Sequence, residues 1–179
     1  MTTVADMIVR SERLDLRLME PALLDALIDG RRPAVATMAD YDIPATFPDA
    51  EQREFLLFRR GQLLADPGRY PWSLRAIVLR SERRMVGYVN FHGAPGVNDT
   101  NTDQAVELGW TVFARDQKRG YATETAVALM AWATEEHGIR HFISSTTPDN
   151  AASLRVHEKL DFARTGEFID GEVIFELRR

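Results

Sequence analysis

Hydrophobic and polar positions alternate along several short segments of the chain, and this period of two is the pattern of strands in a half-buried sheet. The clearest case is residues 13–18, where Leu14, Leu16 and Leu18 fall on one face. The strands that the pattern predicts are residues 13–18, 72–79, 85–91, 105–113, 139–146, 163–168 and 172–177. Polar turns separate the second from the third and the last two from each other, so we expect a hairpin at both places.

Other segments repeat their apolar residues at helical spacing. Helices are predicted at residues 22–29, 51–64, 121–136 and 150–160. Gly30 and Gly138 follow the first and third of these, where a residue free to adopt the left-handed conformation commonly ends a helix. Residues 37–50 and 93–103 are rich in turn-forming residues and predict loops.

The order of these elements predicts an α/β fold. Strand 105–113, helix 121–136 and strand 139–146 form one βαβ unit, whose two strands should pair in parallel through a right-handed crossover. The other strands follow one another as antiparallel neighbours. We therefore expect one domain over residues 1–179, with a mixed, mostly antiparallel sheet and a central parallel strand pair.

Composition and charge narrow the classes of function. The chain has 179 residues and a net charge of −5, without the basic footprint that nucleic-acid binding needs. It has no cysteine, which excludes disulfides, thiolate metal sites and a cysteine acyl-enzyme. The start of the chain carries Asp6 and Arg10 and has no secretory pattern, and no apolar run is long enough to span a bilayer. We expect a cytoplasmic protein without a membrane partner.

The loop before helix 121–136 is the stretch best suited to a ligand. A helix start offers unpaired N–H groups and partial positive charge, which suit a phosphate or pyrophosphate. Lys118 and Arg119 add positive charge there, and Gly120 lets the backbone come close to a ligand. The spacing matches neither the Walker loop nor the dinucleotide fingerprint. The pattern by itself fits a connection that binds nothing equally well.

Two further groups of residues are candidates for acid–base chemistry. Glu107 interrupts an apolar strand and is either an exposed residue or a placed base. On helix 150–160, Asn150, Ser153 and His157 share one stripe, which is either a solvated face with a helix cap or a group of presented side chains.

Three segments resemble the GNAT superfamily of N-acetyltransferases. Gln-x-x-Gly-x-Ala at residues 117–122, after a strand ending Glu-x-Gly-Trp-x-Val, resembles its acyl-CoA-binding motif. Gly-Tyr-Ala-Thr-Glu at residues 120–124 and Asn-x-x-Ser-x-Arg-Val-x-Glu-Lys-Leu-x-Phe at residues 150–162 resemble the branch that includes the ribosomal-protein N-terminal acetyltransferases. Residues 11–18 are similar to the first strand of that branch, Glu-Arg-Leu-x-Leu-Arg.

The resemblance implies acetyl-CoA as co-substrate, its pyrophosphate on the loop and its pantetheine arm beside strand 105–113, which a bulge splays from its parallel neighbour in the family. The implied cofactor-binding residues are Thr111, Val112, Gln117, Lys118, Arg119, Gly120, Tyr121, Ala122 and Asn150.

The resemblance also implies catalytic roles. Glu107 matches a glutamate that acts as general base, directly or through water, and Ser153 matches a serine that protonates the leaving thiolate. The chain departs from the family at Asp161, where a glycine is usual, and at His157, where many relatives carry a tyrosine acid. His157 is therefore an alternative acid, since imidazole ordinarily titrates near neutrality.

The acceptor site is the least defined part of the prediction. Asp40, Tyr41, Asp42 and Phe47 combine carboxylates with aromatic rings, which suits a cationic amine, although an exposed acidic loop would have the same composition. The remaining histidines, His92, His137 and His141, look ordinary. Gly138 breaks the helix that a metal pair at His137 and His141 would need, so we expect no metal.

The expected function is transfer of an acetyl group from acetyl-CoA to a primary amine, such as a protein N-terminus, by direct attack in a ternary complex. One alternative is an acetyltransferase of a small-molecule amine or antibiotic, and another is a non-catalytic acyl-CoA-binding regulatory module. A homodimer is a candidate assembly. The acceptor itself cannot be identified, because acceptor pockets are built from segments that vary within the family.

Overall fold

The computed structural model describes residues 8–179, and all predicted strands and helices are present there with shifted ends. The strands are β1 (Val9–Arg10), β2 (Leu14–Leu18), β3 (Arg75–Leu79), β4 (Arg84–Phe91), β5 (Ala105–Val112), β6 (His141–Thr146), β7 (Ala163–Ile169) and β8 (Glu172–Arg178). The helices are α1 (Pro21–Ile28), α2 (Arg32–Met38), α3 (Ala50–Ala65), α4 (Tyr121–His137) and α5 (Ala151–Lys159), with short 3-10 helices η2 (Pro67–Trp72) and η3 (Ala114–Asp116). Residues 1–7, including the Asp6 used against a secretory signal, lie outside the described residues.

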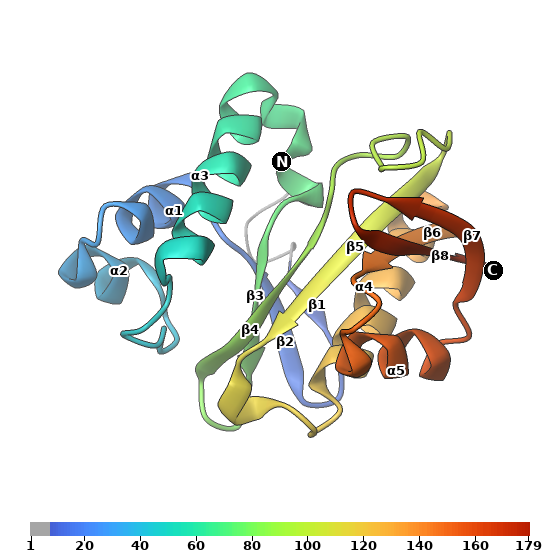
Figure 1. Ribbon diagram of the computed structural model, residues 1–179. Helices are drawn as coiled ribbons and strands as arrows, with labels where there is room; N and C mark the ends of the chain where they lie inside the picture. The colour runs from blue at the N-terminus through green and yellow to red at the C-terminus, as the bar shows by residue number, and fades with distance from the viewer. Residues whose placement is uncertain (1–7) are drawn as a thin grey trace.

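The strands form one sheet in the order β1-β2-β3-β4-β5-β6-β8-β7 (Figure 1). β5 and β6 run parallel, and the other neighbours within the sheet run antiparallel. The prediction of a mostly antiparallel α/β sheet with a central parallel pair is confirmed. No helix within residues 8–179 has the length and hydrophobicity needed to cross a membrane.

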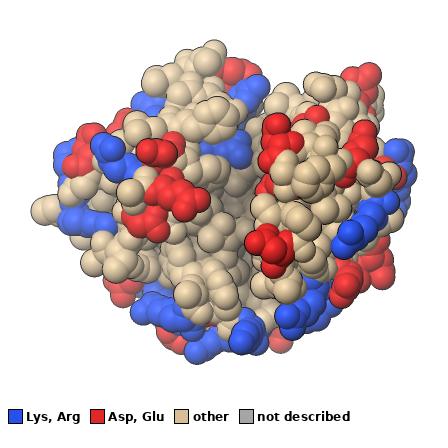
Figure 2. Space-filling model, viewed as in Figure 1, with Lys and Arg blue, Asp and Glu red and all other residues tan. Residues whose placement is uncertain are grey.

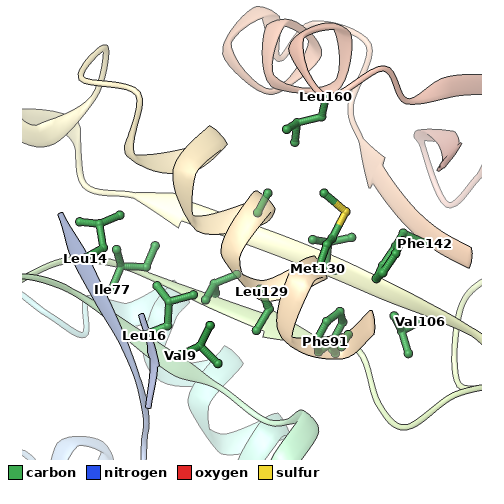
Figure 3. Close-up of a cluster of buried hydrophobic side chains, with 14 of the residues drawn as sticks. Val9, Leu14, Leu16, Ile77, Phe91, Val106, Leu129, Met130, Phe142 and Leu160 are labelled. Atoms are coloured by element: carbon green, nitrogen blue, oxygen red, sulfur yellow. The ribbon is translucent and has the colours of Figure 1, made fainter. Parts of the chain in front are cut away.

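Helices cover both faces of the sheet, because successive side chains of a strand point to opposite sides. Ile77 and Leu79 of β3 pack in the cluster under α4, whereas Ala76 and Val78 pack in the cluster under α1 and α3. Figure 3 shows Leu129 and Met130 of α4 pointing into the first cluster. The cluster under α1 and α3 includes no residue of β6, β7 or β8. The two faces therefore differ in how far their cores extend.

One described strand, one α-helix and the two short 3-10 helices were not predicted. β1 has two residues, which is too short for a periodic pattern. α2 has seven residues, and Val35 is its one buried side chain, so it carries no helical repeat of apolar residues. Their positions depend on the tertiary structure rather than on local pattern.

The sheet opens between its two parallel strands. β5 and β6 pair at Ala105↔His141, Val106↔Phe142 and Glu107↔Ile143. β5 then continues to Val112 and β6 to Thr146 without further pairing between them. The separation that the resemblance implied is thus present, and it begins at Glu107.

Candidate active site

The opening between β5 and β6 forms a cleft with a volume of about 480 Å³. α3 lies on one side of this cleft and α5 on the other, with residues of β4, β5, β6 and β8 between them. Figure 2 shows the corresponding hollow on this face of the molecule, with acidic side chains along both of its sides. The carboxylates that line it are Asp49, Glu51 and Glu172.

Glu107 lies where the two parallel strands separate, and its side chain is 0% exposed. The interpretation of Glu107 as an exposed residue is therefore wrong. Its Oε2 accepts the backbone N–H of Asp99 at 2.8 Å and lies 3.3 Å from Nδ1 of His92. Burial by itself would raise the pKa of this carboxyl, but the His92 ring and the Asp99 N–H hold it below its ordinary value. The Ser145 hydroxyl donates to Glu172 at 2.6 Å, and Oε1 of Glu107 has no hydrogen-bond partner in the described part of the chain.

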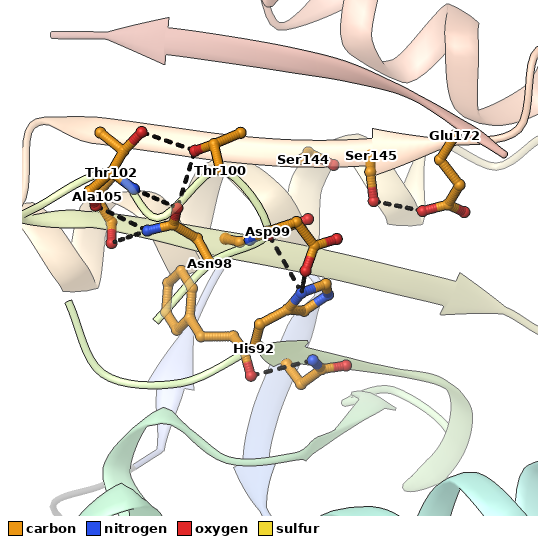
Figure 4. Close-up of polar contacts among 12 residues, drawn as sticks. His92, Asn98, Asp99, Thr100, Thr102, Ala105, Ser144, Ser145 and Glu172 are labelled. Carbon is orange, nitrogen blue, oxygen red and sulfur yellow. Dashed lines mark hydrogen bonds and ion pairs between the residues drawn. The ribbon is translucent and has the colours of Figure 1, made fainter. Parts of the chain in front are cut away.

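His92 is the functional candidate that sequence reasoning missed. It follows β4, and its N–H donates to the carbonyl of Glu107 at 2.7 Å, so the two side chains are cross-strand neighbours on one face. The ring lines the cleft and is 30% exposed. Figure 4 shows His92 beside Asp99, whose Oδ1 lies 3.9 Å from Nδ1. The signal that would have found His92 is the antiparallel register of β4 with β5, which places Phe91 opposite Leu108.

Charged groups surround this pair. The buried Arg59 of α3 donates from Nη1 to the carbonyl of His92 at 3.1 Å, and burial lowers the pKa of its guanidinium to about 10. Burial raises the pKa of Asp99, and the charges of Glu107 and Glu172 add to this effect while His92 opposes it. Ligand atoms of His92, Asp99 and Glu107 lie within 4.8 Å of one another, a spacing that a metal ion could also occupy.

Three of the predicted site residues line the cleft, namely Thr111, Asn150 and Ser153. Asn150 precedes α5 and caps it, because its Oδ1 accepts the N–H of Ser153 at 3.1 Å. Ser153 is half-buried in the first turn of that helix. The cap therefore holds the serine at the mouth of the cleft.

His157 does not reach the cleft. Its ring is 0% exposed and stacks on Phe175 with the centroids 4.1 Å apart. Nδ1 lies 2.8 Å from the carbonyl of Ser153, so it carries the proton, and Nε2 accepts the hydroxyl of Ser144 at 3.0 Å. Burial lowers the pKa of His157 to about 4. A neutral imidazole whose N–H is already bonded to a carbonyl has no proton to give, so the structure does not support His157 as the acid.

The predicted pyrophosphate loop has the geometry of an open helix start. Gly120 has φ +81° and stands at the N-cap of α4 without a side-chain cap. Gln117, Lys118, Arg119 and Gly120 are exposed, and Nε2 of Gln117 donates to the carbonyl of Val112 at 3.1 Å. The loop thereby folds back on the end of β5.

Arg13, in the connection between β1 and β2, contacts two residues at the end of this loop. It donates to the carbonyl of Arg119 at 3.0 Å, and its guanidinium lies 4.7 Å from the ring centroid of Tyr121. The Tyr121 side chain is buried, so the backbone N–H is what this residue can offer a ligand. Ala122 follows it in the first turn of α4.

The predicted acceptor residues are not brought together with the cleft. Asp40, Tyr41 and Asp42 line a different hollow of about 670 Å³, which shares no lining residue with the cleft. Asp40 pairs with Arg17 at 3.0 Å. Phe47 is 2% exposed and belongs to the core under α1 and α3, so its assignment to the acceptor site is corrected. The polar loop around Phe47 in the sequence does not indicate that its side chain is buried.

Comparisons with known proteins show the family of the chain. The model of the acetyltransferase (GNAT) domain matches residues 13–163. The uncharacterized N-acetyltransferase YnaD of Bacillus subtilis is 29% identical over 92 residues, 51% of each protein, so the match spans about half the length of that relative. The uncharacterized N-acetyltransferase YjdG of the same organism is 24% identical over 155 residues, 87% of this chain and 89% of that protein.

A solved structure from Salmonella typhimurium has the same fold. That acetyl transferase, described as modifying the N-terminal serine of the 50S ribosomal subunit protein L7/L12, is 20% identical, with a TM-score of 0.64 over 96% of this chain and 99% of that one. Because the domain model covers most of the sequence, from the first long strand to the final hairpin, the chain belongs to the GNAT family of acetyl-CoA-dependent acetyltransferases.

Proposed function

We propose that the protein transfers the acetyl group of acetyl-CoA to a primary amine held in the cleft between β5 and β6. The observation that carries this proposal is the end of strand pairing at Glu107, where the opened strands bring His92, with the Glu107 carboxylate behind it, and Ser153 to one cavity. Proton acceptor, proton donor and binding space thus occur together, as amide formation from a thioester requires.

The chain offers groups that suit both the pyrophosphate and the pantetheine arm of the co-substrate. Bound acetyl-CoA would supply an activated acetyl thioester. Lys118, Arg119 and the N–H groups after Gly120 would hold its pyrophosphate, since a helix start attracts anions. The edge of β5 at Thr111 and Val112, which is not paired with β6, and the side chain of Asn150 would hold the pantetheine arm.

The chain's own groups divide the proton transfers. The buried Glu107, whose pKa is held below its ordinary value, supplies the negative charge that favours proton removal from the amine. Because its side chain is 0% exposed, it acts through a neighbour rather than by touching the amine. Oγ of Ser153 supplies a proton to the leaving sulfur, as its position on the wall of the cleft allows.

The acceptor is proposed to be a protein or peptide N-terminus. Asp49, Glu51 and Glu172 line the cleft, and one arginine, Arg59, faces them. This excess of carboxylates suits a cationic amine. The similar enzyme from Salmonella is described as modifying an N-terminal serine, which supports the same class of acceptor here.

The test is CoA release from acetyl-CoA with a panel of peptides that differ at the N-terminus, alongside free amino acids, polyamines and aminoglycosides. We expect peptides to give the highest kcat/KM. Turnover confined to polyamines or aminoglycosides would favour the small-molecule alternative. Tight acetyl-CoA binding without turnover of any amine would favour the non-catalytic module. In the same assay Ser153→Ala should lower kcat at every pH without recovery in alkali, because the lost group is an acid.

A further inference from the structure

We propose that Nε2 of His92 is the atom that takes the proton from the acceptor amine, with Glu107 as the positioning residue behind it. This inference rests on the proposed function and names the base of that same site. The resemblance implied Glu107 as the general base, and this inference assigns that role to His92, which follows β4.

Access favours the imidazole over the carboxylate. Glu107 is 0% exposed and does not line the cavity, and its Oε2 already accepts the N–H of Asp99 at 2.8 Å. His92 lines the cavity and is 30% exposed. A general base must come within hydrogen-bond reach of the amine, and only the imidazole of this pair can do so.

The orientation of the ring leaves one nitrogen for the substrate. Nδ1 lies 3.3 Å from Oε2 of Glu107, so the carboxylate favours a proton on Nδ1, and the lone pair of Nε2 is then left for the substrate. Nε2 lies over Gly109 in the floor of the cleft, where a Cβ would stand 3.7 Å from it. The absence of a side chain at Gly109 therefore keeps Nε2 accessible from the cavity.

The backbone of His92 is fixed on both sides. Its N–H donates to the carbonyl of Glu107 at 2.7 Å, and its carbonyl accepts Nη1 of Arg59 at 3.1 Å. A base whose ring and backbone are both held costs little reorganisation when the substrate arrives. The charged groups beside the ring are Glu107 of β5 and Asp99 of the loop that precedes β5. The same cleft is lined by Arg59 and by the carboxylates Asp49, Glu51 and Glu172.

The proton balance closes without any further reagent. The nitrogen of the neutral amine forms a bond to the acetyl carbon, the carbon–sulfur bond breaks, and one proton leaves the nitrogen while one reaches the sulfur. An amine that arrives as the ammonium first releases one proton to solvent. Nε2 of His92 accepts the first proton, and the imidazolium is stabilised by the carboxylate on its other side. The exposed ring edge returns that proton to solvent, and Oγ of Ser153 supplies the second and takes a proton back from solvent.

The first experiment uses His92→Ala in the full chain. We expect kcat with an accepted peptide to fall by about 10²–10⁴-fold at pH 7. Added imidazole should restore part of the rate, because a free base can enter the space left by the side chain. The matched control is His141→Ala. His141 lies on β6, pairs with Glu176 of β8 at 2.8 Å and does not line the cleft. This variant should keep the wild-type rate and show no imidazole rescue.

Two further variants separate the residues of the pair. Glu107→Gln should lower kcat while leaving KM for acetyl-CoA unchanged, because the imidazolium that forms during the reaction loses its counter-charge. Gly109→Ala should lower kcat by placing a methyl group against Nε2, at a distance the fold tolerates. Gly61→Ala, on α3 with open space around it, is its control.

Several outcomes would overturn the assignment. These are a His92→Ala enzyme at the wild-type rate, a loss without imidazole rescue, or a loss that EDTA reproduces in the wild type, which would indicate a metal ion. The ¹⁵N shifts of the His92 ring give a readout independent of turnover, and a proton on Nε2 rather than Nδ1 would contradict the pair. If no amine is acetylated but the ring shows the expected tautomer, the proposed function fails and the geometry of the pair stands.

Discussion

At the scale of single residues, His157 shows how burial decides the role of an ionisable side chain. Its imidazole stacks on Phe175, and both ring nitrogens are bonded, to the Ser153 carbonyl and the Ser144 hydroxyl. Charging the ring would require a cation in this packed environment without a carboxylate beside it, so burial lowers its pKa to about 4. His157 connects α5 to β6 through these two bonds, and it thereby helps to hold the helix that carries Ser153 beside the cleft.

His157 should therefore make stability depend on pH. The pKa of His157 is lower in the folded chain than the ordinary value of about 6.5. Its contribution to the free energy of unfolding is therefore fully present above about pH 6.5 and is lost as the pH falls towards 4. The shift corresponds to a loss of roughly 3 kcal/mol over that range. In His157→Phe, which cannot titrate, we expect lower stability at pH 7.5, because Ser144 loses its acceptor, but a flatter dependence from pH 6.5 to 4. Urea unfolding at pH 7.5, 6 and 5 measures both, with His137→Gln at an exposed position as the control. Equal slopes in the wild type and His157→Phe would remove His157 as the source.

At the scale of elements, α4 begins and ends with a glycine in the left-handed conformation. Gly120 has φ +81° at its N-cap, and Gly138 has φ +69° at its C-cap. A Cβ at Gly120 would meet Nη2 of Arg13 at 3.5 Å, an ordinary contact, and a Cβ at Gly138 would meet nothing within 4 Å. The two positions share the same backbone strain on substitution, and only the first lies at the proposed pyrophosphate loop.

Substitutions at Gly120 and Gly138 can therefore be compared to test the cofactor loop. Gly120→Glu should weaken acetyl-CoA binding by at least about tenfold, roughly 1.4 kcal/mol, because it places a side chain and a negative charge where the pyrophosphate would bind. Gly138→Glu should leave the affinity unchanged. Calorimetric titration measures both, and circular dichroism verifies that the variants are folded. Equal affinities for acetyl-CoA in the two variants would remove the loop from the cofactor site.

The elements also show where sequence pattern suffices and where it does not. Alternation in β5 placed Glu107 on the face opposite Val106 and Leu108, and helical spacing located α4 and α5. The His92–Glu107 pair depends on the register of β4 with β5, and a shift of one residue would have moved His92 to the other face. The burial of Phe47 depends on α1 and α3 packing over it. Local periodicity contains neither kind of information.

At the scale of the whole molecule, the sheet is held together unequally on its two faces. Under α4 the core is continuous across the opening and includes Phe142 and Phe175 with the strands of the other side. The cluster under α1 and α3 stops before β6, and a separate small cluster of Ala105, Ile143 and Ile174 joins β5 to β6 and β8. Beyond the three residue pairs of β5 with β6, no strand pairing joins the two sides of the cleft in the described chain. A ligand in the cleft would add contacts between these sides.

Acetyl-CoA should therefore stabilise the folded protein and protect the strands that it bridges. At a concentration 100 times Kd, ligand linkage contributes about 2.7 kcal/mol, which for a domain of this size raises Tm by roughly 5–10 °C. Hydrogen exchange should slow at residues 108–112 and 144–146, on the two sides of the opening, and change little at β2 and β3, which are paired in register for five residues. Gly120→Glu at the same acetyl-CoA concentration is the control and should show a smaller rise in Tm. A rise in Tm accompanied by protection at β2 and β3 but none at residues 108–112 and 144–146 would place the co-substrate outside the cleft, because a ligand held between two strands must restrict the opening of both.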